Sequence, residues 1–165
     1  MVNEGQNSLY EDIKLSLFSN LCNATGVYRR TIGNDKKRGF QQNAKLIIKE
    51  LIAKVDTDVI KNQDIRESIK KLAKESGFND KIGASQKVIN VYLKYYCAVA
   101  NKNQNVMKEL DCPIDSLVRR DNRLPNISIK EMIFEDYVKD QNILEENYAM
   151  RVMADIPAYD KRKSY

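Results

Sequence analysis

The stretch GFNDKIGASQKVINVYLKYYCAVA, residues 77–100, lies at the centre of the 165-residue chain and decides its fold. A basic amphipathic helix is predicted before it, over residues 59–76, and Gly77 follows as a left-handed C-cap. A tight segment containing Gly83 then leads to a strongly apolar helix predicted over residues 87–100, with Lys87 at its start. The pattern is that of a helical hairpin whose second helix is buried.

A second stretch, DCPIDSLVRR, covers residues 111–120. Pro113 restricts the backbone just ahead of Asp115, so this carboxylate is predicted at the N-terminus of another short helix. Free N–H groups and the helix dipole stabilise a negative charge there. The chain thus places one amine, Lys87, and one carboxylate, Asp115, each at a predicted helix start.

This arrangement resembles the helix-hairpin-helix DNA glycosylases, in which glycines stand four and two residues before a lysine and a proline-hydrophobic-aspartate turn follows. Gly83 matches the first glycine, Ser85 replaces the second, Lys87 matches the lysine, and residues 113–115 match the turn. The separation of 28 residues from Lys87 to Asp115 is similar to that of the archaeal-type 8-oxoguanine DNA glycosylase/lyases. The resemblance covers about 45 of the 165 residues.

The resemblance implies an enzyme that acts on double-stranded DNA carrying a damaged or modified base, without a cofactor or a metal. Lys87 would attack the sugar C1′ of a flipped nucleotide and form a Schiff base, with strand cleavage as a possible second step. Asp115 would stabilise the cationic sugar and help to move protons. The two side chains would then have to lie within a few ångströms of each other.

Candidate DNA-binding residues are grouped around these two. Gly83 and Ser85 would approach the phosphates through the hairpin, although a close backbone approach at position 85 normally requires glycine. Gln86 is a candidate contact to a base or a phosphate. Three arginines directly after Asp115 are candidate phosphate contacts: Arg119, Arg120 and Arg123.

A further basic segment covers residues 24–39. It is predicted as a hairpin that turns at residues 33–35, or as an irregular loop. Arg29 and Arg30 would contact phosphates if the segment is a DNA-binding arm. A solvated basic loop is the other interpretation.

The amino-acid composition favours one class of partner and excludes several kinds of catalytic site. The formal net charge of +5 and a pI near 9.0 favour an anionic partner, with nucleic acid first. The chain has no histidine, which excludes Ser-His-Asp hydrolysis and most catalytic zinc sites. Its three cysteines are widely spaced and indicate neither a disulfide framework, a zinc site nor a four-cysteine iron–sulfur cluster. Without an apolar run of bilayer length or a signal peptide, the expected location is cytoplasmic.

The remaining pattern predicts an all-α chain of about seven helices. A single compact domain is expected over residues 1–160, followed by a basic flexible tail over 161–165. A capping box at Ser128–Glu131 is expected to open one of the later helices. The other predicted helices cover residues 9–23, 41–55, 106–110 and 142–153.

Two other functions fit the same sequence. One is a non-enzymatic helical DNA-binding or inhibitor protein, encoded by a phage or mobile element, that acts through its basic surface. The other is a helical interaction domain without a nucleic-acid role. The chemistry assigned to Lys87 separates the enzyme from the first alternative, and salt-sensitive binding separates both from the second. The base that is recognised and the oligomeric state are not indicated by the sequence.

Overall fold

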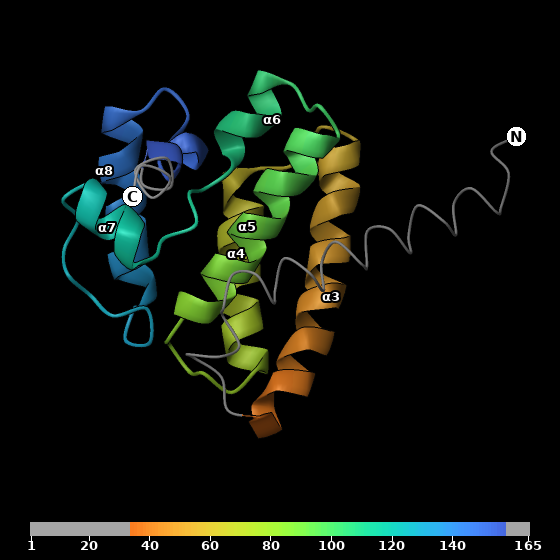
Figure 1. Ribbon diagram of the computed structural model, residues 1–165. Helices are drawn as coiled ribbons and strands as arrows, with labels where there is room; N and C mark the ends of the chain where they lie inside the picture. Colours follow the sequence, from red (N-terminus) through yellow and green to blue (C-terminus); the bar gives the residue numbers. More distant parts are fainter. Residues whose placement is uncertain (1–33, 158–165) are drawn as a thin grey trace, which may run out of the picture.

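A computed structural model describes residues 34–157 of the chain, with side chains from residue 37. Every regular element within this range is helical, which confirms the predicted all-α fold (Figure 1). The elements are α3 (Asn34–Asp56), α4 (Asn62–Glu75), α5 (Gly83–Val99), α6 (Gln104–Glu109), α7 (Ser116–Asp121), α8 (Phe134–Asn147) and the 3-10 turn η1 (Arg151–Met153). The predicted helix 9–23, Arg29, Arg30 and the tail 161–165 lie outside the described residues.

Helices α3, α4 and α5 pack against one another as a three-helix layer. Each contributes apolar side chains at helical spacing to one core, among them Phe40, Ile47 and Leu51 from α3, Ile65, Ile69 and Leu72 from α4, and Ile89 and Leu93 from α5. Burial of these side chains is the main driving force for the packing. None of the helices in the described range is long and apolar enough to cross a membrane.

The predicted hairpin of α4 and α5 is present, and Gly77 ends α4 as expected. Its φ of 69° is left-handed, its N–H donates to the Lys74 carbonyl at 3.1 Å, and the Phe78 N–H donates to the Ala73 carbonyl at 3.0 Å. These two bonds form a Schellman motif, which satisfies carbonyl groups at the end of the helix. The motif also places the Phe78 ring 5.6 Å from the ring of Phe40 on α3.

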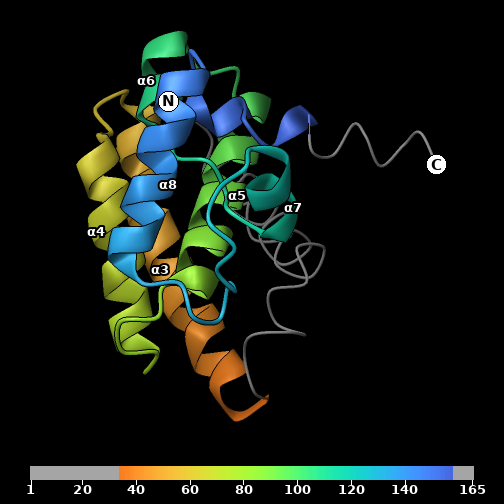
Figure 2. The same cartoon turned by 90° about the vertical axis from the view of Figure 1, so that its left-hand side faces the viewer.

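Helices α7 and α8 and the turn η1 form a C-terminal layer on the side of α5 opposite α3 (Figures 1 and 2). The chain enters this layer through residues 110–115, which are neither helix nor strand and are almost wholly buried. A second connection comes from Met132, whose carbonyl accepts the Ile82 N–H just before α5 at 2.9 Å. The N-terminus of α5 is therefore covered by the segment that leads into α8.

Several helix boundaries differ from the prediction. Helix α3 begins at Asn34, so residues 34–40 continue the core helix and form neither a hairpin nor an irregular loop. Helix α4 begins at Asn62, where the Asp64 carboxylate accepts the Lys61 N–H at 2.9 Å. Helix α5 begins at Gly83, so Lys87 is its fifth residue and lies in the second turn.

The predicted capping box was also wrong. Ser128 and Glu131 close a turn through a 2.9 Å backbone bond, and α8 starts only at Phe134. Asp136 then accepts the Ile133 N–H at 3.5 Å, in the position that a capping box gives to its acidic residue. Helix α8 runs without a break to Asn147, so the helix predicted over residues 142–153 is its second half plus η1.

Helix α5 is less uniformly buried than its composition indicates. Twelve of its residues are buried, but Tyr95 and Val99 near its C-terminal end are exposed. Leu46, predicted in the core face of α3, is exposed as well. Apolar composition alone did not separate the covered face from the uncovered one.

Candidate active site

Lys87 and Asp115 meet between α5 and α7. The Lys87 Nζ lies 3.5 Å from the Asp115 Oδ2, and the two side chains are 15% and 13% exposed. Residues 28 positions apart in the chain are thus brought into an ion pair that is largely shielded from water but still reachable. This is the separation of a few ångströms that the proposed chemistry requires.

Asp115 is the N-cap of α7, in agreement with the prediction. Its Oδ1 accepts the N–H groups of Leu117 at 2.9 Å and Val118 at 3.1 Å. Two of the unpaired donors of the first turn are satisfied in this way, and the carboxylate is held in one orientation. The other oxygen, Oδ2, is left facing the Lys87 ammonium.

Gln86 lies in the interior between Lys87 and the turn that carries Asp115. Its amide nitrogen donates to the Ile114 carbonyl at 2.7 Å, and its amide oxygen accepts the Ile114 N–H at 3.1 Å. The side chain is fully buried. Its observed partner is thus the backbone of the protein, where the sequence predicted a base or a phosphate.

Gly83 and Ser85 are buried too. A Cβ atom at Gly83 would stand 1.7 Å from the Ile129 carbonyl oxygen, so packing against the 125–133 segment already requires glycine there. The Ser85 hydroxyl is fully buried and has no hydrogen-bond partner among the described residues. Neither position is open to DNA in this conformation.

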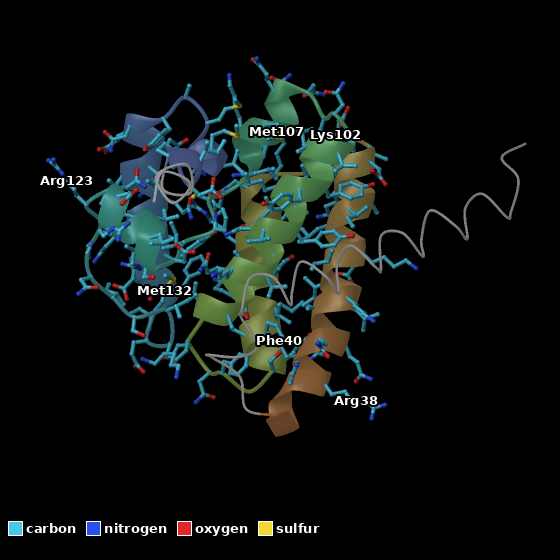
Figure 3. The ribbon with its side chains drawn as sticks, viewed as in Figure 1. Arg38, Phe40, Lys102, Met107, Arg123 and Met132 are labelled. Carbon is cyan, nitrogen blue, oxygen red and sulfur yellow. The ribbon has the colours of Figure 1, made fainter. Side chains whose placement is uncertain are left out.

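The three arginines after Asp115 differ in their surroundings. Arg119 is buried, with its Nη2 2.5 Å from the Asp140 Oδ2 on α8 and its Nη1 donating to the Pro125 carbonyl. Burial raises the pKa of Asp140 to about 6, while the Arg119 charge opposes that rise. Arg120 and Arg123 are exposed, and Arg123 points outward from the C-terminal layer (Figure 3). Of the predicted arginines that the structure describes, only Arg120 and Arg123 are open to a phosphate.

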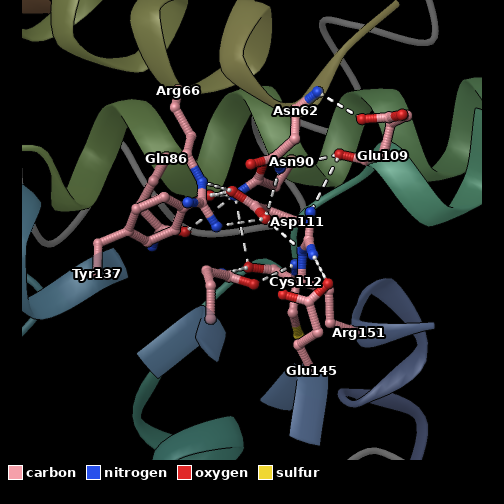
Figure 4. A network of polar contacts seen from close by, with 11 residues as sticks. Asn62, Arg66, Gln86, Asn90, Glu109, Asp111, Cys112, Tyr137, Glu145 and Arg151 are labelled. Carbon is pink, nitrogen blue, oxygen red and sulfur yellow. Dashed lines mark hydrogen bonds and ion pairs between the residues drawn. The ribbon is translucent and has the colours of Figure 1, made fainter. Parts of the chain in front are cut away.

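A polar cluster around Asp111 was not found from the sequence. The carboxylate of Asp111 is fully buried and receives hydrogen bonds from Arg66 at 3.0 Å, Tyr137 at 2.8 Å, Asn62 at 2.9 Å and Arg151 at 2.5 Å (Figure 4). These groups come from α4, α8 and η1, so Asp111 joins the two layers. Arg66 lies on the basic amphipathic helix predicted from the sequence, and nothing local indicates that it is paired with a buried carboxylate.

Lys94 forms a second shielded ion pair on the same helix. It contacts Asp155, and the two side chains are 15% and 9% exposed. Because Lys94 follows Lys87 by two helical turns, the two amines lie on the same face of α5 about 10 Å apart along its axis. Lys94 therefore offers a matched comparison for any test of Lys87.

The described cysteines are unsuited to nucleophilic chemistry. Burial raises the pKa of the Cys97 thiol to about 11 and the pKa of the Cys112 thiol well above its usual range. Both groups are held as thiols near neutral pH, and the thiolate is the reactive form. Lysine remains the better candidate nucleophile in the described part of the chain.

A small pocket opens beside the first turn of α5. It is lined by Phe78, Lys81, Gly83, Ala84, Ile129 and Lys130, so two ammonium groups stand near the positive end of a helix dipole. No three acidic, histidine or cysteine side chains within residues 34–157 are close enough together to hold a metal ion. Comparison of the chain with protein-family models, curated proteins and solved structures finds no match.

Proposed function

We propose that this protein is a DNA glycosylase with AP lyase activity, which removes a damaged or modified base from double-stranded DNA through a Schiff base on Lys87. The observation that carries the proposal is the ion pair of Lys87 and Asp115. Its two members match the lysine and aspartate of the resemblance, and they lie 3.5 Å apart although 28 residues separate them.

In this mechanism Lys87 is the nucleophile and Asp115 the proton carrier. Asp115 Oδ2 takes a proton from the Lys87 ammonium, and the neutral Nζ attacks C1′ of a flipped nucleotide. The bond from C1′ to the base breaks, and its electron pair leaves with the base, which takes up the proton. The C1′–O4′ bond then breaks, O4′ takes up a proton that Asp115 carries from Nζ, and the opened sugar remains as a Schiff base on Nζ. Asp115 next accepts a C2′ proton, and the electron pair that is released breaks the C3′–O bond and expels the 3′ phosphate.

The surroundings of the pair support this assignment. Both side chains are mostly withdrawn from water, which strengthens the effect of the Asp115 charge on a cationic sugar. The N-cap bonds hold the carboxylate in place, so little reorganisation is needed when charge develops. The buried cysteines leave Lys87 without a competing sulfur nucleophile in the described residues.

DNA contacts are assigned to exposed cations around the pair. Arg120 and Arg123 extend from the end of the helix that Asp115 begins, and they would contact phosphates on one side of the flipped nucleotide. Lys81 and the exposed Lys130 line the pocket at the start of α5, where the helix dipole is positive. Lys81 is paired there with Glu131 at 3.0 Å, so a phosphate in this pocket would take the place of that carboxylate.

Borohydride trapping tests the proposal. The protein is mixed with duplexes that carry an abasic site, 8-oxoguanine or uracil, and covalent adducts are separated by electrophoresis. We expect an adduct with the wild type that is lost in Lys87→Gln and strongly reduced in Asp115→Asn. Lys94→Gln should keep it, because this variant removes an equally shielded amine from the same helix.

Three results would count against this function. The absence of an adduct and of base release on every duplex would leave a helical DNA-binding protein as the better description. An adduct that survives in Lys87→Gln but not in Lys94→Gln would move the chemistry to the second pair. Unchanged DNA affinity in Lys87→Gln together with unchanged base release would remove the role of Lys87 altogether.

A further inference from the structure

Residues 110–115 connect the two layers in an extended conformation. Leu110 and Asp115 at its ends have φ/ψ of −75°/139° and −138°/−177°, and residues 110–114 between the layers are all buried. A buried extended segment needs partners for its N–H and C=O groups, because unpaired backbone groups away from water are costly. No strand runs beside it in the described fold, so the partners must come from elsewhere.

Two buried glutamines supply them. Gln86 on α5 bonds both the carbonyl and the N–H of Ile114, at 2.7 and 3.1 Å. Gln141 on α8 does the same for Cys112, accepting its N–H at 2.9 Å and donating to its carbonyl at 2.7 Å. A primary amide carries one acceptor oxygen and two donor hydrogens, so each glutamine serves a residue as an adjacent strand would.

These two pairs of hydrogen bonds, which we call the Gln86 clamp and the Gln141 clamp, differ in their distance from Lys87 and Asp115. Gln86 precedes Lys87 directly, and Ile114 precedes Asp115 directly. The two hydrogen bonds from Gln86 to Ile114 therefore join the backbones that carry the amine and the carboxylate, one residue from each. Gln141 holds the same segment from the other layer, at Cys112, two residues before Ile114 in the chain.

We propose that Gln86 and Gln141 are positioning residues that set the distance between Lys87 and Asp115, with Gln86 the more important of the two. This inference rests on the proposed glycosylase function. The N-cap bonds of Asp115 fix its carboxylate relative to α7. The two Gln86 bonds to Ile114 tie the start of α7 to α5, beside a longer contact of 3.4 Å from the Asn90 amide on α5 to the Cys112 carbonyl. Loss of a clamp lets the ion pair open, and small displacements of reacting groups slow a reaction strongly.

The test compares trapping kinetics of Gln86→Met and Gln141→Met with the wild type. Methionine has a similar length and is apolar, so it removes both hydrogen bonds without leaving a large cavity. An abasic-site duplex is used under single-turnover conditions over a range of protein concentrations. Two quantities are read: the rate at saturation and the protein concentration that gives half of it.

We expect Gln86→Met to lower the saturating rate by roughly 10- to 100-fold. The protein concentration that gives half of this rate should stay unchanged within about twofold. Gln141→Met should lower the rate less. Ile69→Val, a core substitution on α4, is the control for lost stability: it should lower the melting temperature and leave the trapping rate unchanged.

Should Gln86→Met fail to fold, Gln86→Glu takes its place. The carboxylate still accepts the Ile114 N–H, but it cannot donate to the Ile114 carbonyl and places a buried charge against that oxygen, so we expect a loss of rate at least as large. Amide hydrogen exchange at Ile114 reports the clamp itself without any DNA and should be faster in either variant.

The outcomes separate the two proposals. Normal trapping by a folded Gln86 variant, or an equal slowing by Ile69→Val, overturns the positioning role while the glycosylase function stands. A wild-type protein that forms no adduct overturns the glycosylase function, and the positioning role with it. If the Gln86 variant needed more protein to reach half of the saturating rate, and the saturating rate itself were unchanged, Gln86 would be assigned to DNA binding and the inference would be contradicted.

Discussion

At the scale of single residues, Gly83 has a purpose that its place in a motif does not reveal. The Ile129 carbonyl oxygen lies where a side chain would begin, so the glycine allows the segment before α8 to cover the N-terminus of α5. Gly39, within α3, makes no such contact, because among the described residues no atom outside the neighbouring backbone of its own helix lies within 4 Å of the position that a methyl group would take there. The two glycines therefore predict opposite responses to the same substitution.

We expect Gly83→Ala to lower the free energy of unfolding by about 1–3 kcal/mol, because the Ile129 backbone must move. Gly39→Ala should raise it by about 0.5–1 kcal/mol, since alanine is the better residue inside a helix. Urea unfolding followed by circular dichroism measures both. If the two substitutions changed the free energy of unfolding equally and in the same direction, the close approach of the Ile129 carbonyl to Gly83 would be contradicted.

Asp111 is the residue on which the polar contacts between the layers converge. Its replacement by alanine leaves the guanidinium groups of Arg66 and Arg151 without their buried partner. We expect Asp111→Ala to cost about 3–5 kcal/mol in urea unfolding. Glu50→Ala removes an exposed carboxylate that is paired with Lys71 and should cost less than about 1 kcal/mol. Similar costs for the two variants would mean that Asp111 is not the link described.

At the scale of elements, the helices were predictable to a useful degree and their ends were not. The stretches of α3, α4 and α5 follow from helical spacing of apolar side chains, whereas the single helix α8 was predicted as parts of two helices. The start of α8 does not follow from the local sequence. Ser128 begins a complete capping-box sequence, but in the structure these residues close a turn. Met132 accepts the Ile82 N–H instead of continuing a helix, and this contact between distant segments overrides the local preference.

We expect the contact between α7 and α8 to depend on pH. Burial raises the pKa of Asp140 from its ordinary value of 3.8 to about 6, with Arg119 opposing the rise and Asp136 adding to it. The folded state then holds a proton that the unfolded state releases between about pH 4 and 6. Stability from this group is complete below pH 3.8 and is lost as the pH rises through 6.

The corresponding measurement is urea unfolding of the wild type and Asp140→Asn from about pH 4 to about pH 7. Relative to the variant, the wild type should lose at most about 3 kcal/mol over this range. Asp136→Asn controls for the removal of a neighbouring charge and should largely keep the pH dependence. A difference that does not vary with pH would place the pKa of Asp140 near its ordinary value.

At the scale of the whole molecule, the candidate site lies between the layers, and the two arginines assigned to DNA, Arg120 and Arg123, lie on the C-terminal side. Arg123 extends from that side, whereas Arg38 extends from α3 on the opposite side (Figure 3). We therefore expect Arg120 and Arg123, but not the exposed cations of α3, to contribute to DNA affinity.

The salt dependence of DNA binding shows which of these cations contact phosphates. Each phosphate contact that is lost reduces the slope of log K against log salt concentration by about 1. We expect that reduction for Arg120→Gln and for Arg123→Gln in fluorescence anisotropy titrations. Lys49→Gln, which changes an exposed cation on α3, should leave the slope unchanged. Equal slopes for all three variants would exclude the C-terminal side as the DNA-binding face.

The choice of Lys87 and Asp115 as a pair came from the family resemblance. The sequence by itself determined the all-α class, the hairpin of α4 and α5 with its C-cap at Gly77, and the N-cap at Asp115. These features depend on local rules, namely periodicity, capping and the conformations open to glycine and proline, which act over a few residues. The tertiary structure alone decided which polar side chains are buried. Gln86 and Arg119 look like contacts for a ligand but are bonded inside the protein, and Asp111, Arg66 and Gln141 carry no local mark of their roles. Burial depends on which surfaces meet across the fold, and the meeting of distant surfaces is not encoded at any one position.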